Sequence, residues 1–220
     1  MQTTEAAYTD GGMRWQVIAP DGSNSLAWPN SLIGHGANEL QDTWTLPASG
    51  TYTVTIDPSA TATGSVKFRA WSVPNDVALT YAMDSPAKTI TTTSSGQNAV
   101  LTIAGQAGQR IAIETTGSTY NNVSWSLLDP ASAGLAQGGG NGWTDALTLP
   151  SAGTYRFVID PAGLDVGSIT VRAWTVGADV DAGTVAFGGT KVAATVATPG
   201  RGATARFTAP ASPLRERTRL

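Results

Sequence analysis

Bulky and polar side chains alternate along short stretches of this chain, and the clearest of these stretches occurs twice. Residues 46–73 (LPASGTYTVTIDPSATATGSVKFRAWSV) and 149–176 (LPSAGTYRFVIDPAGLDVGSITVRAWTV) align without a gap at an offset of 103 residues. The alternation predicts strands that face a core on one side and water on the other. A period of about 100 residues is the size of a small domain, so the sequence predicts a tandem array of similar domains.

Each copy predicts two strands. The first covers residues 51–56 or 154–159, and the second covers residues 65–73 or 168–176. Leu-Pro-x-x-Gly before the first strand and Asp-Pro after it predict a turn at both of its ends. The inner side chains expected on the first strands are Tyr52, Val54 and Ile56 in one copy and Tyr155, Phe157 and Ile159 in the other.

Further strands are predicted around the second copy, with turns every 8–12 residues, which is typical of an antiparallel β-sandwich. They cover residues 90–93, 100–104, 110–114, 124–128 and 146–149. Trp15 and Trp125 alternate with polar neighbours and are expected in the cores, whereas the Gly-rich residues 134–142 predict a loop.

The expected fold is therefore all-β, with tandem antiparallel β-sandwiches of about seven to eight strands each, of which the first and last copies are incomplete. Residues 1–77 are expected to form a sandwich that lacks its opening strands, and residues 78–182 a complete one. Residues 183–220 would hold the opening strands of a third copy, followed by a disordered basic tail.

Composition narrows the class of protein. The chain has 13% charged residues, 25 glycines and no cysteine. Low charge with many Thr, Gly and Val residues is typical of secreted all-β modules, and the absence of cysteine excludes disulfides, thiolate metal sites and a cysteine nucleophile. No signal peptide or membrane-spanning run is found, so an export signal would lie outside this chain.

Charge is distributed unevenly along the chain. The net charge is −3, yet residues 201–220 contain five arginines and a single acidic residue, Glu216. The remainder is therefore more acidic than the total suggests, and an extended nucleic-acid interface is not expected.

Candidate catalytic and metal-binding residues are few. The single histidine, His35, lies between two glycines and has no counterpart in the other copy, so neither a catalytic triad nor a histidine-rich zinc site is expected. Asp145, Asp160 and Asp165 are the candidate calcium ligands, although aspartates in such turns usually accept backbone N–H groups. No other cofactor is expected.

Candidate ligand-binding residues lie on the outer face of the second strand of each copy, where an arginine precedes a tryptophan by two positions. These pairs are Arg69 with Trp71 and Arg172 with Trp174, and Trp28 is a further candidate aromatic. Each arginine could stack on its indole, or the pair could form a platform for a sugar ring. The remaining alternative is that both tryptophans pack against the linker to the next domain.

Several spaced motifs carry a resemblance to a known family. They are Leu149-Pro150, Gly153-Thr154-Tyr155, Ile159-Asp160-Pro161, Gly167-Ser168 and Gly108-Gln109-Arg110. With these motifs the chain resembles the β-sandwich modules of the bacterial pre-peptidase C-terminal domain group, as found in large secreted or surface YD-repeat-type proteins of actinobacteria. The resemblance implies a non-catalytic accessory module, and some members of the group bind calcium.

The function expected is a non-catalytic extracellular or cell-surface module that acts as a spacer, adhesion or interaction unit of a larger bacterial protein. The alternative is a carbohydrate-binding accessory module of a secreted hydrolase. Expected partners are neighbouring domains of the same polypeptide and polysaccharide, cell-wall or matrix material, but no nucleic acid. The missing opening strands also suggest head-to-tail self-association by strand addition.

Overall fold

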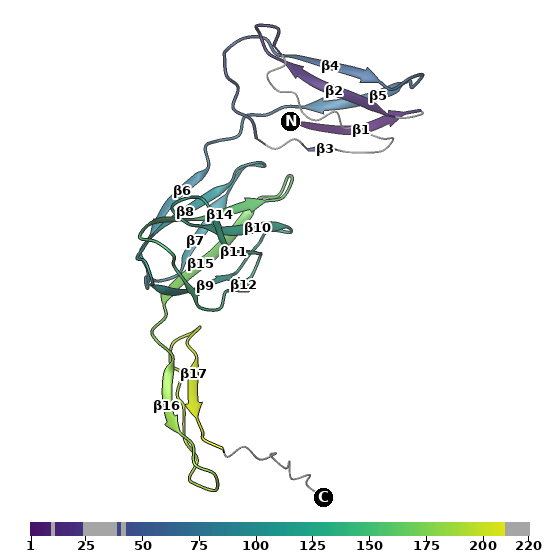
Figure 1. Cartoon of the computed structure of the whole chain (residues 1–220). Helices are drawn as coiled ribbons and strands as arrows, with labels where there is room; N and C mark the ends of the chain where they lie inside the picture. The colour runs from purple at the N-terminus through teal and green to yellow at the C-terminus, as the bar shows by residue number, and fades with distance from the viewer. Residues whose placement is uncertain (10–11, 24–38, 41–42, 210–220) are drawn as a thin grey trace, which may run out of the picture.

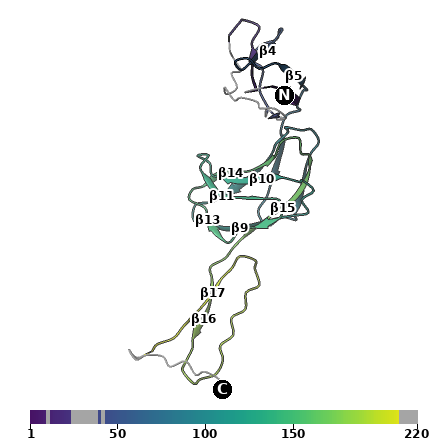
Figure 2. The same ribbon diagram turned by 90° about the vertical axis from the view of Figure 1, so that its right-hand side faces the viewer.

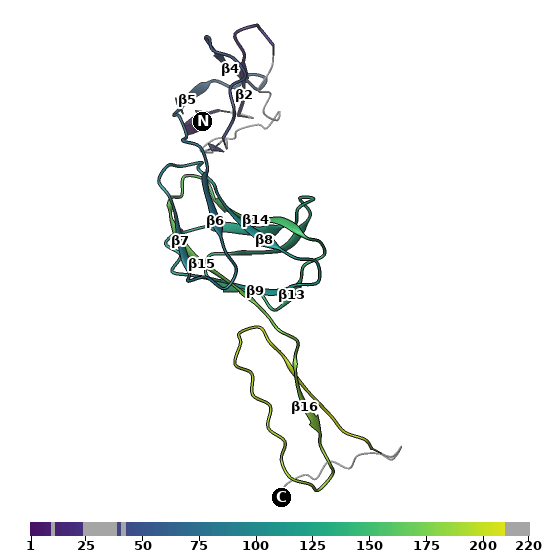
Figure 3. The same cartoon turned by 90° about the vertical axis from the view of Figure 1, so that its left-hand side faces the viewer.

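The structure is a computed structural model that describes residues 1–9, 12–23, 39–40 and 43–209 (Figure 1). These residues form strands, turns and loops, and the all-β fold predicted from the sequence is confirmed. No helix that could cross a membrane occurs among them. Three groups of strands follow one another along the molecule, in the same end-to-end order when it is turned either way (Figures 2 and 3).

The first group contains five strands in two small antiparallel sheets. One sheet has the order β3-β1-β5 and the other pairs β2 with β4. The strands are β1 (Gln2–Tyr8), β2 (Met13–Ile18), β3 (Glu39–Leu40), β4 (Thr53–Pro58) and β5 (Gly64–Arg69).

The middle group is a two-layer sandwich of ten strands. One sheet has the order β11-β10-β14-β8-β6, and the other has the order β12-β9-β15-β7, with β13 also paired to β9. All pairs are antiparallel except β6 with β8. The strands are β6 (Val77–Tyr81), β7 (Lys88–Thr92), β8 (Ala99–Gly105), β9 (Arg110–Thr116), β10 (Val123–Leu128), β11 (Gly134–Gly139), β12 (Gly142–Trp143), β13 (Leu147–Thr148), β14 (Gly153–Pro161) and β15 (Gly167–Thr175).

The core of the sandwich lies between its two sheets. Trp125 is buried, as expected, and stacks on Phe157 with ring centroids 5.0 Å apart. Tyr155 and Ile159, from the same face of β14, and Leu101 from β8 are also buried in this cluster. The alternation read from residues 154–159 therefore identifies the core face of β14 correctly.

The first group repeats part of this sandwich in the same register. Trp15 lies opposite Ile56 in β2–β4, as Trp125 lies opposite Ile159 in β10–β14. The pairs β1–β5 and β9–β15 correspond in the same way, as do the short strands β3 and β12.

The Leu-Pro-x-x-Gly-Thr-Tyr motif has a structural reason in the middle sandwich. The Tyr155 hydroxyl donates to the carbonyl of Ser151 at 2.6 Å, which closes the turn before the strand. Gly153 has φ of 147°, in the range that favours glycine, and a Cβ there would lie 2.7 Å from Cγ of Pro130. In the first group, Tyr52 donates likewise to the carbonyl of Ala48 at 2.8 Å.

Strands β6, β7 and β8 have no counterpart in the first group as described. Strand β4 consequently pairs only with β2, whereas β14 lies between β10 and β8. Val54 and Ile56 are 37% and 43% exposed, although their counterparts Phe157 and Ile159 are fully buried. The prediction that both side chains face a core is met only in part in the first copy, because no strand among the described residues covers them.

Two other local predictions differ from the structure. Residues 134–139 form strand β11 rather than a loop, and the chain crosses to the other sheet only at residues 140–141. Glycine is required at Gly138 because the indole of Trp125 occupies the space of a side chain. The Asp-Pro pairs, predicted to form turns, are instead the last two residues of β4 and β14. Each proline ends its strand and has a paired residue on one neighbouring strand at most, so its missing N–H breaks no row of hydrogen bonds.

The third group is a pair of parallel strands, β16 (Val180–Thr184) and β17 (Ala203–Arg206). Val180 lies opposite Ala203, as Val77 lies opposite Ala99 in β6–β8. The described residues 185–202 form no strand, although residues 191–195 correspond to β7. The basic tail beyond residue 209, predicted to be disordered, lies outside the described residues.

Candidate functional site

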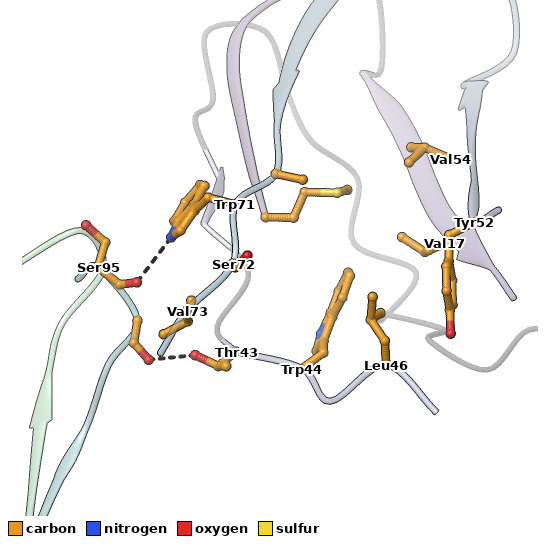
Figure 4. A pocket seen from close by; sticks show the side chains of 13 residues that line it. Val17, Thr43, Trp44, Leu46, Tyr52, Val54, Trp71, Ser72, Val73 and Ser95 are labelled. Atoms are coloured by element: carbon orange, nitrogen blue, oxygen red, sulfur yellow. Dashed lines mark hydrogen bonds between the residues drawn. The ribbon is translucent and has the colours of Figure 1, made fainter. Parts of the chain in front are cut away.

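The two tryptophans singled out by the sequence lie where one strand group meets the next. At the first of these contacts, the Trp71 indole N–H donates to the carbonyl of Ser95 at 3.2 Å (Figure 4). The Thr43 hydroxyl donates to the carbonyl of Gly96 at 2.6 Å. We call this contact, between the first strand group and the loop at residues 94–98, the first joint.

A matching contact, the second joint, links the middle sandwich to the loop at residues 198–202. Gly200 in this loop has φ of 76°, and a Cβ there would lie 2.9 Å from the Ala112 Cβ and 3.4 Å from the Trp143 ring. The loop therefore packs directly on the outer face of the sheet that contains β9. Arg201 fixes the loop from the other side, because its Nε donates to the carbonyl of Ala178 at 2.6 Å.

Both joints contain the same two hydrogen bonds between the linker and the loop, which we call the bracket. The carboxylate of Asp76 accepts the N–H of Asn98 at 3.1 Å, and that of Asp179 accepts the N–H of Gly202 at 3.2 Å. The N–H of the residue after each aspartate donates to the carbonyl of Asn98 or Gly202, at 2.9 and 3.0 Å. The repeat therefore includes the way in which each loop is tied to the linker before it.

An ion pair strengthens the second joint. Arg110, from the Gly-Gln-Arg motif, lies 3.0 Å from Asp179 and also donates to the carbonyl of Gly177 at 3.1 Å. The hydrogen bond from Arg110, followed by that from the N–H of Gly202, holds the pKa of the Asp179 carboxyl below its ordinary value. The Gly-Gln-Arg motif, which in the sequence only supported the family resemblance, is thus part of the second joint.

The arginine–tryptophan pairs stack at both joints. The guanidinium carbon of Arg172 lies 4.9 Å from the ring centroid of Trp174, and that of Arg69 lies 5.6 Å from Trp71. Both distances are within the range of a cation–π interaction. The structure thus shows that the arginines stack and that Trp71 contacts the following loop, whereas Trp174 packs on Trp143, whose ring lies near the loop at residues 198–202.

Trp143 is an additional candidate that the sequence analysis missed. Its ring lies 5.2 Å from that of Trp174, and it is 41% exposed. Its position on β12, opposite Glu114 of β9, places it on the outer face that also carries Arg172. The candidate Trp28 lies outside the described residues.

A cavity of about 620 Å³ lies beside the β2–β4 sheet and reaches the first joint, where Trp71, Ser95 and Gly96 line it (Figure 4). Its size is within the usual range for ligand pockets, about 300–1,000 Å³. Most of its wall is apolar, and it includes Val17, Leu46, Tyr52, Val54, Ala70 and Trp71.

The candidate calcium ligands are not assembled into a metal site. Within the described residues, no group of three His, Asp or Glu side chains is placed to share a metal ion, and Asp145, Asp160 and Asp165 form no such group. Asp165 accepts the N–H of Asn122 at 2.7 Å, which lowers the pKa of its carboxyl, and it also accepts from Asn121. His35 lies outside the described residues.

Comparison with known proteins places these features in a wider context. No family model and no curated protein match the chain. The chain is similar in fold to a pre-peptidase C-terminal domain. That domain, from a collagenase of Bacillus anthracis, is 10% identical with a TM-score of 0.36, over 48% of this chain and 99% of the domain.

Two solved periplasmic inhibitors of g-type lysozyme, both called PliG, are similar at the same level. The protein from Aeromonas hydrophila is 18% identical with a TM-score of 0.34, over 44% of this chain and 98% of its own. The protein from Salmonella Typhimurium is 10% identical with a TM-score of 0.33, over 44% and 97%. These likenesses concern the fold alone.

Proposed function

We propose that the chain is a non-catalytic spacer and interaction module of a larger extracellular or cell-surface protein, and that residues 1–77, 78–182 and 183–220 belong to three successive copies of one β-sandwich repeat. Its partners in this role are the neighbouring modules of the same polypeptide. Adhesion would then be a property of the assembled protein, to which these modules contribute length and spacing.

The observation that supports the proposal is the repeated joint. Asp76 and Asp179 make equivalent hydrogen bonds at the two junctions, and a tryptophan ring lies beside the following loop at each, Trp71 at the first and Trp143 at the second. A chain that only linked independent domains would need no such bracket, because flexible linkers suffice for that purpose. Equivalent contacts at successive junctions are typical of repeat proteins that hold a defined spacing.

Small-angle X-ray scattering of the full chain tests the spacer role, at dilutions where light scattering shows a single chain. The wild type should give a narrow distribution of maximum dimension, as expected for an extended particle. The double variant Asp76→Ala/Asp179→Ala should give a broader one, because both brackets lose their acceptor.

Asp129→Ala is the matched control. Asp129 also accepts backbone N–H groups, from Ala131 and Ala133, but within a turn of the middle sandwich. This control should leave the scattering unchanged. A wild type that already populates compact and extended shapes broadly would contradict the proposal.

Carbohydrate binding is the second candidate function, and the partly exposed aromatic cluster on the second joint favours it. Trp143 and Trp174 form a tilted pair with rings 5.2 Å apart, and Arg172 supplies a planar donor beside them. An aromatic face next to a hydrogen-bond donor suits a sugar ring. The partner would be polysaccharide or cell-wall material.

Pull-down with insoluble chitin, cellulose and peptidoglycan tests this candidate. Binding that is lost in Trp143→Ala and kept in Phe187→Ala, which removes an exposed aromatic far from the cluster, would support it. Equal binding by both variants, or no binding by the wild type, would exclude the cluster as a sugar site.

A further inference from the structure

Two strand edges of the first group have no partner among the described residues. Strand β4 pairs only with β2, and β5 pairs only with β1. In the middle sandwich, the corresponding edges of β14 and β15 are covered by β8 and β7. An uncovered edge presents a row of N–H and C=O groups that can pair with another strand.

The cavity in the first group corresponds to filled core in the middle sandwich. Val54, Tyr52 and Leu46 line the cavity, and their counterparts Phe157, Tyr155 and Leu149 are all at most 1% exposed. In the sandwich, β8 lies along this surface, with Leu101 opposite Phe157 and Ile103 opposite Tyr155. The side of the cavity formed by these residues is therefore where the inward side chains of a β8-like strand would lie.

The third group contains strands that match the missing ones. Strands β16 and β17 pair in parallel with the register of β6 and β8, and residues 191–195 correspond to β7. Their apolar side chains are uncovered: Phe207 is 60% exposed, and Val192 and Val196 are also exposed. The chain thus carries an acceptor at one end and the matching donor at the other.

We propose that residues 180–209 of one chain add to the first strand group of a second copy and complete its sandwich. Strand β17 runs antiparallel beside β4, and residues 191–195 run beside β5. The register follows from β14–β8, so Ala203 lies opposite Ile56, Ala205 opposite Val54 and Phe207 opposite Tyr52. The inward side chains of β17, and that of Phe207 directly after it, then line or fill the cavity.

The arrangement of the molecule favours addition between chains. The first group and the β16–β17 pair lie at opposite ends, with the middle sandwich between them, in all three views (Figures 1, 2 and 3). A donor and an acceptor at opposite ends make a head-to-tail contact that does not close on itself, and this contact generates open filaments.

This inference goes beyond the proposed function, because it holds whether or not the joints are rigid. Cysteine pairing tests it at the level of single residues, since the chain contains no native cysteine. Opposed residues in an antiparallel pair lie about 4.5–5.5 Å apart at Cα, which suits a disulfide. A mixture of full-length Val54→Cys and Ala205→Cys chains should therefore form a disulfide-linked dimer under mild oxidation.

The matched control is a mixture of Val54→Cys with Arg206→Cys. A shift of one residue turns the side chain to the opposite face of the strand, so this pair should not cross-link. Equal cross-linking of both mixtures would overturn the proposed register. A disulfide that forms within single chains of the Val54→Cys/Ala205→Cys double variant would overturn the assignment to a second copy.

Light scattering provides an independent readout. The mass of the wild type should rise with concentration, and Ala205→Asp should abolish this rise because it places a carboxylate in an apolar cavity. Thr208→Asp, on the outer face just after the same strand, should not abolish it. Ala205 and Thr208 are both exposed in the single chain, so neither variant disturbs its fold. A wild type that stays a monomer at high concentration would overturn the proposal.

Discussion

Truncation of one isoleucine in each copy provides a direct test of how the two copies differ. Ile56 and Ile159 occupy the same position in the repeated Ile-Asp-Pro motif and face Trp15 and Trp125 in the same register. Ile159 is fully buried between the sheets, whereas Ile56 is 43% exposed. The variants Ile56→Ala and Ile159→Ala thus make an identical chemical change in two environments.

The expected loss of unfolding free energy follows from this difference in burial. The change removes three carbons, worth about 0.8 kcal/mol each when buried, or about 2.4 kcal/mol in total. At Ile159 the void left behind adds to this, which gives about 3–4 kcal/mol. At Ile56 only about half of this transfer free energy is lost, because the side chain is already partly exposed. No closed void forms there, so we expect a loss of about 1 kcal/mol.

Hydrogen exchange measured by mass spectrometry resolves the two sheets separately. The free energy of opening in peptides that cover β14 should fall by about 3–4 kcal/mol in Ile159→Ala, and that in peptides that cover β4 by about 1 kcal/mol in Ile56→Ala. Equal losses at the two sites in the single chain would refute the conclusion that the first core is open. In an assembly with a second copy, the loss at Ile56 should approach the loss at Ile159.

Two further predictions concern the packing of the core and the second joint. Gly138→Ala should destabilise the middle sandwich by about 1–3 kcal/mol in denaturant titrations, because a methyl group there collides with the Trp125 ring. Gly134→Ala on the same strand is the control: its methyl group meets no atom, and the free energy of unfolding should change little. The folded-state pKa of Asp179 is lowered, so its contribution to the joint is complete above the ordinary carboxyl value of 3.8 and is lost as the pH falls through the folded pKa. The amide resonance of Gly202 should shift in this acid range in the wild type, and a shift of the same size in Asp179→Asn would contradict this assignment.

Local patterns were sufficient to predict most strands of the middle sandwich. Alternation at residues 154–159 identified β14 and its inner face, because each bulky side chain there has a partner strand on both sides. The same alternation is present at Val77, Leu79 and Tyr81, but β6 is not among the predicted strands because its neighbour β8 is distant in sequence and pairs with it in parallel. Strand β11 was missed because its glycines are explained only by the indole that packs on them.

The candidate site could be predicted only in part. The spacing of Arg172 and Trp174 was sufficient to predict a stack, since residues two apart on a strand lie on the same face. Trp143 could not be assigned to the same cluster, because β12 joins this face through β9 and no local pattern shows that pairing. The role of Asp179 likewise depends on Arg110 and Gly202, which are distant in sequence but adjacent at the joint.

The sequence by itself determined that the fold is all-β and that residues 46–73 recur at residues 149–176, because alternation, turn residues and the offset of 103 positions are properties of the chain alone. Only the tertiary structure decided which repeated side chains are buried. Val54 and Phe157 occupy equivalent positions, yet burial depends on whether a neighbouring strand is present, and that strand comes from another part of the repeat. Because burial depends on strands that are distant in sequence, the cavity and its relation to β16 and β17 could be recognised only in the tertiary structure.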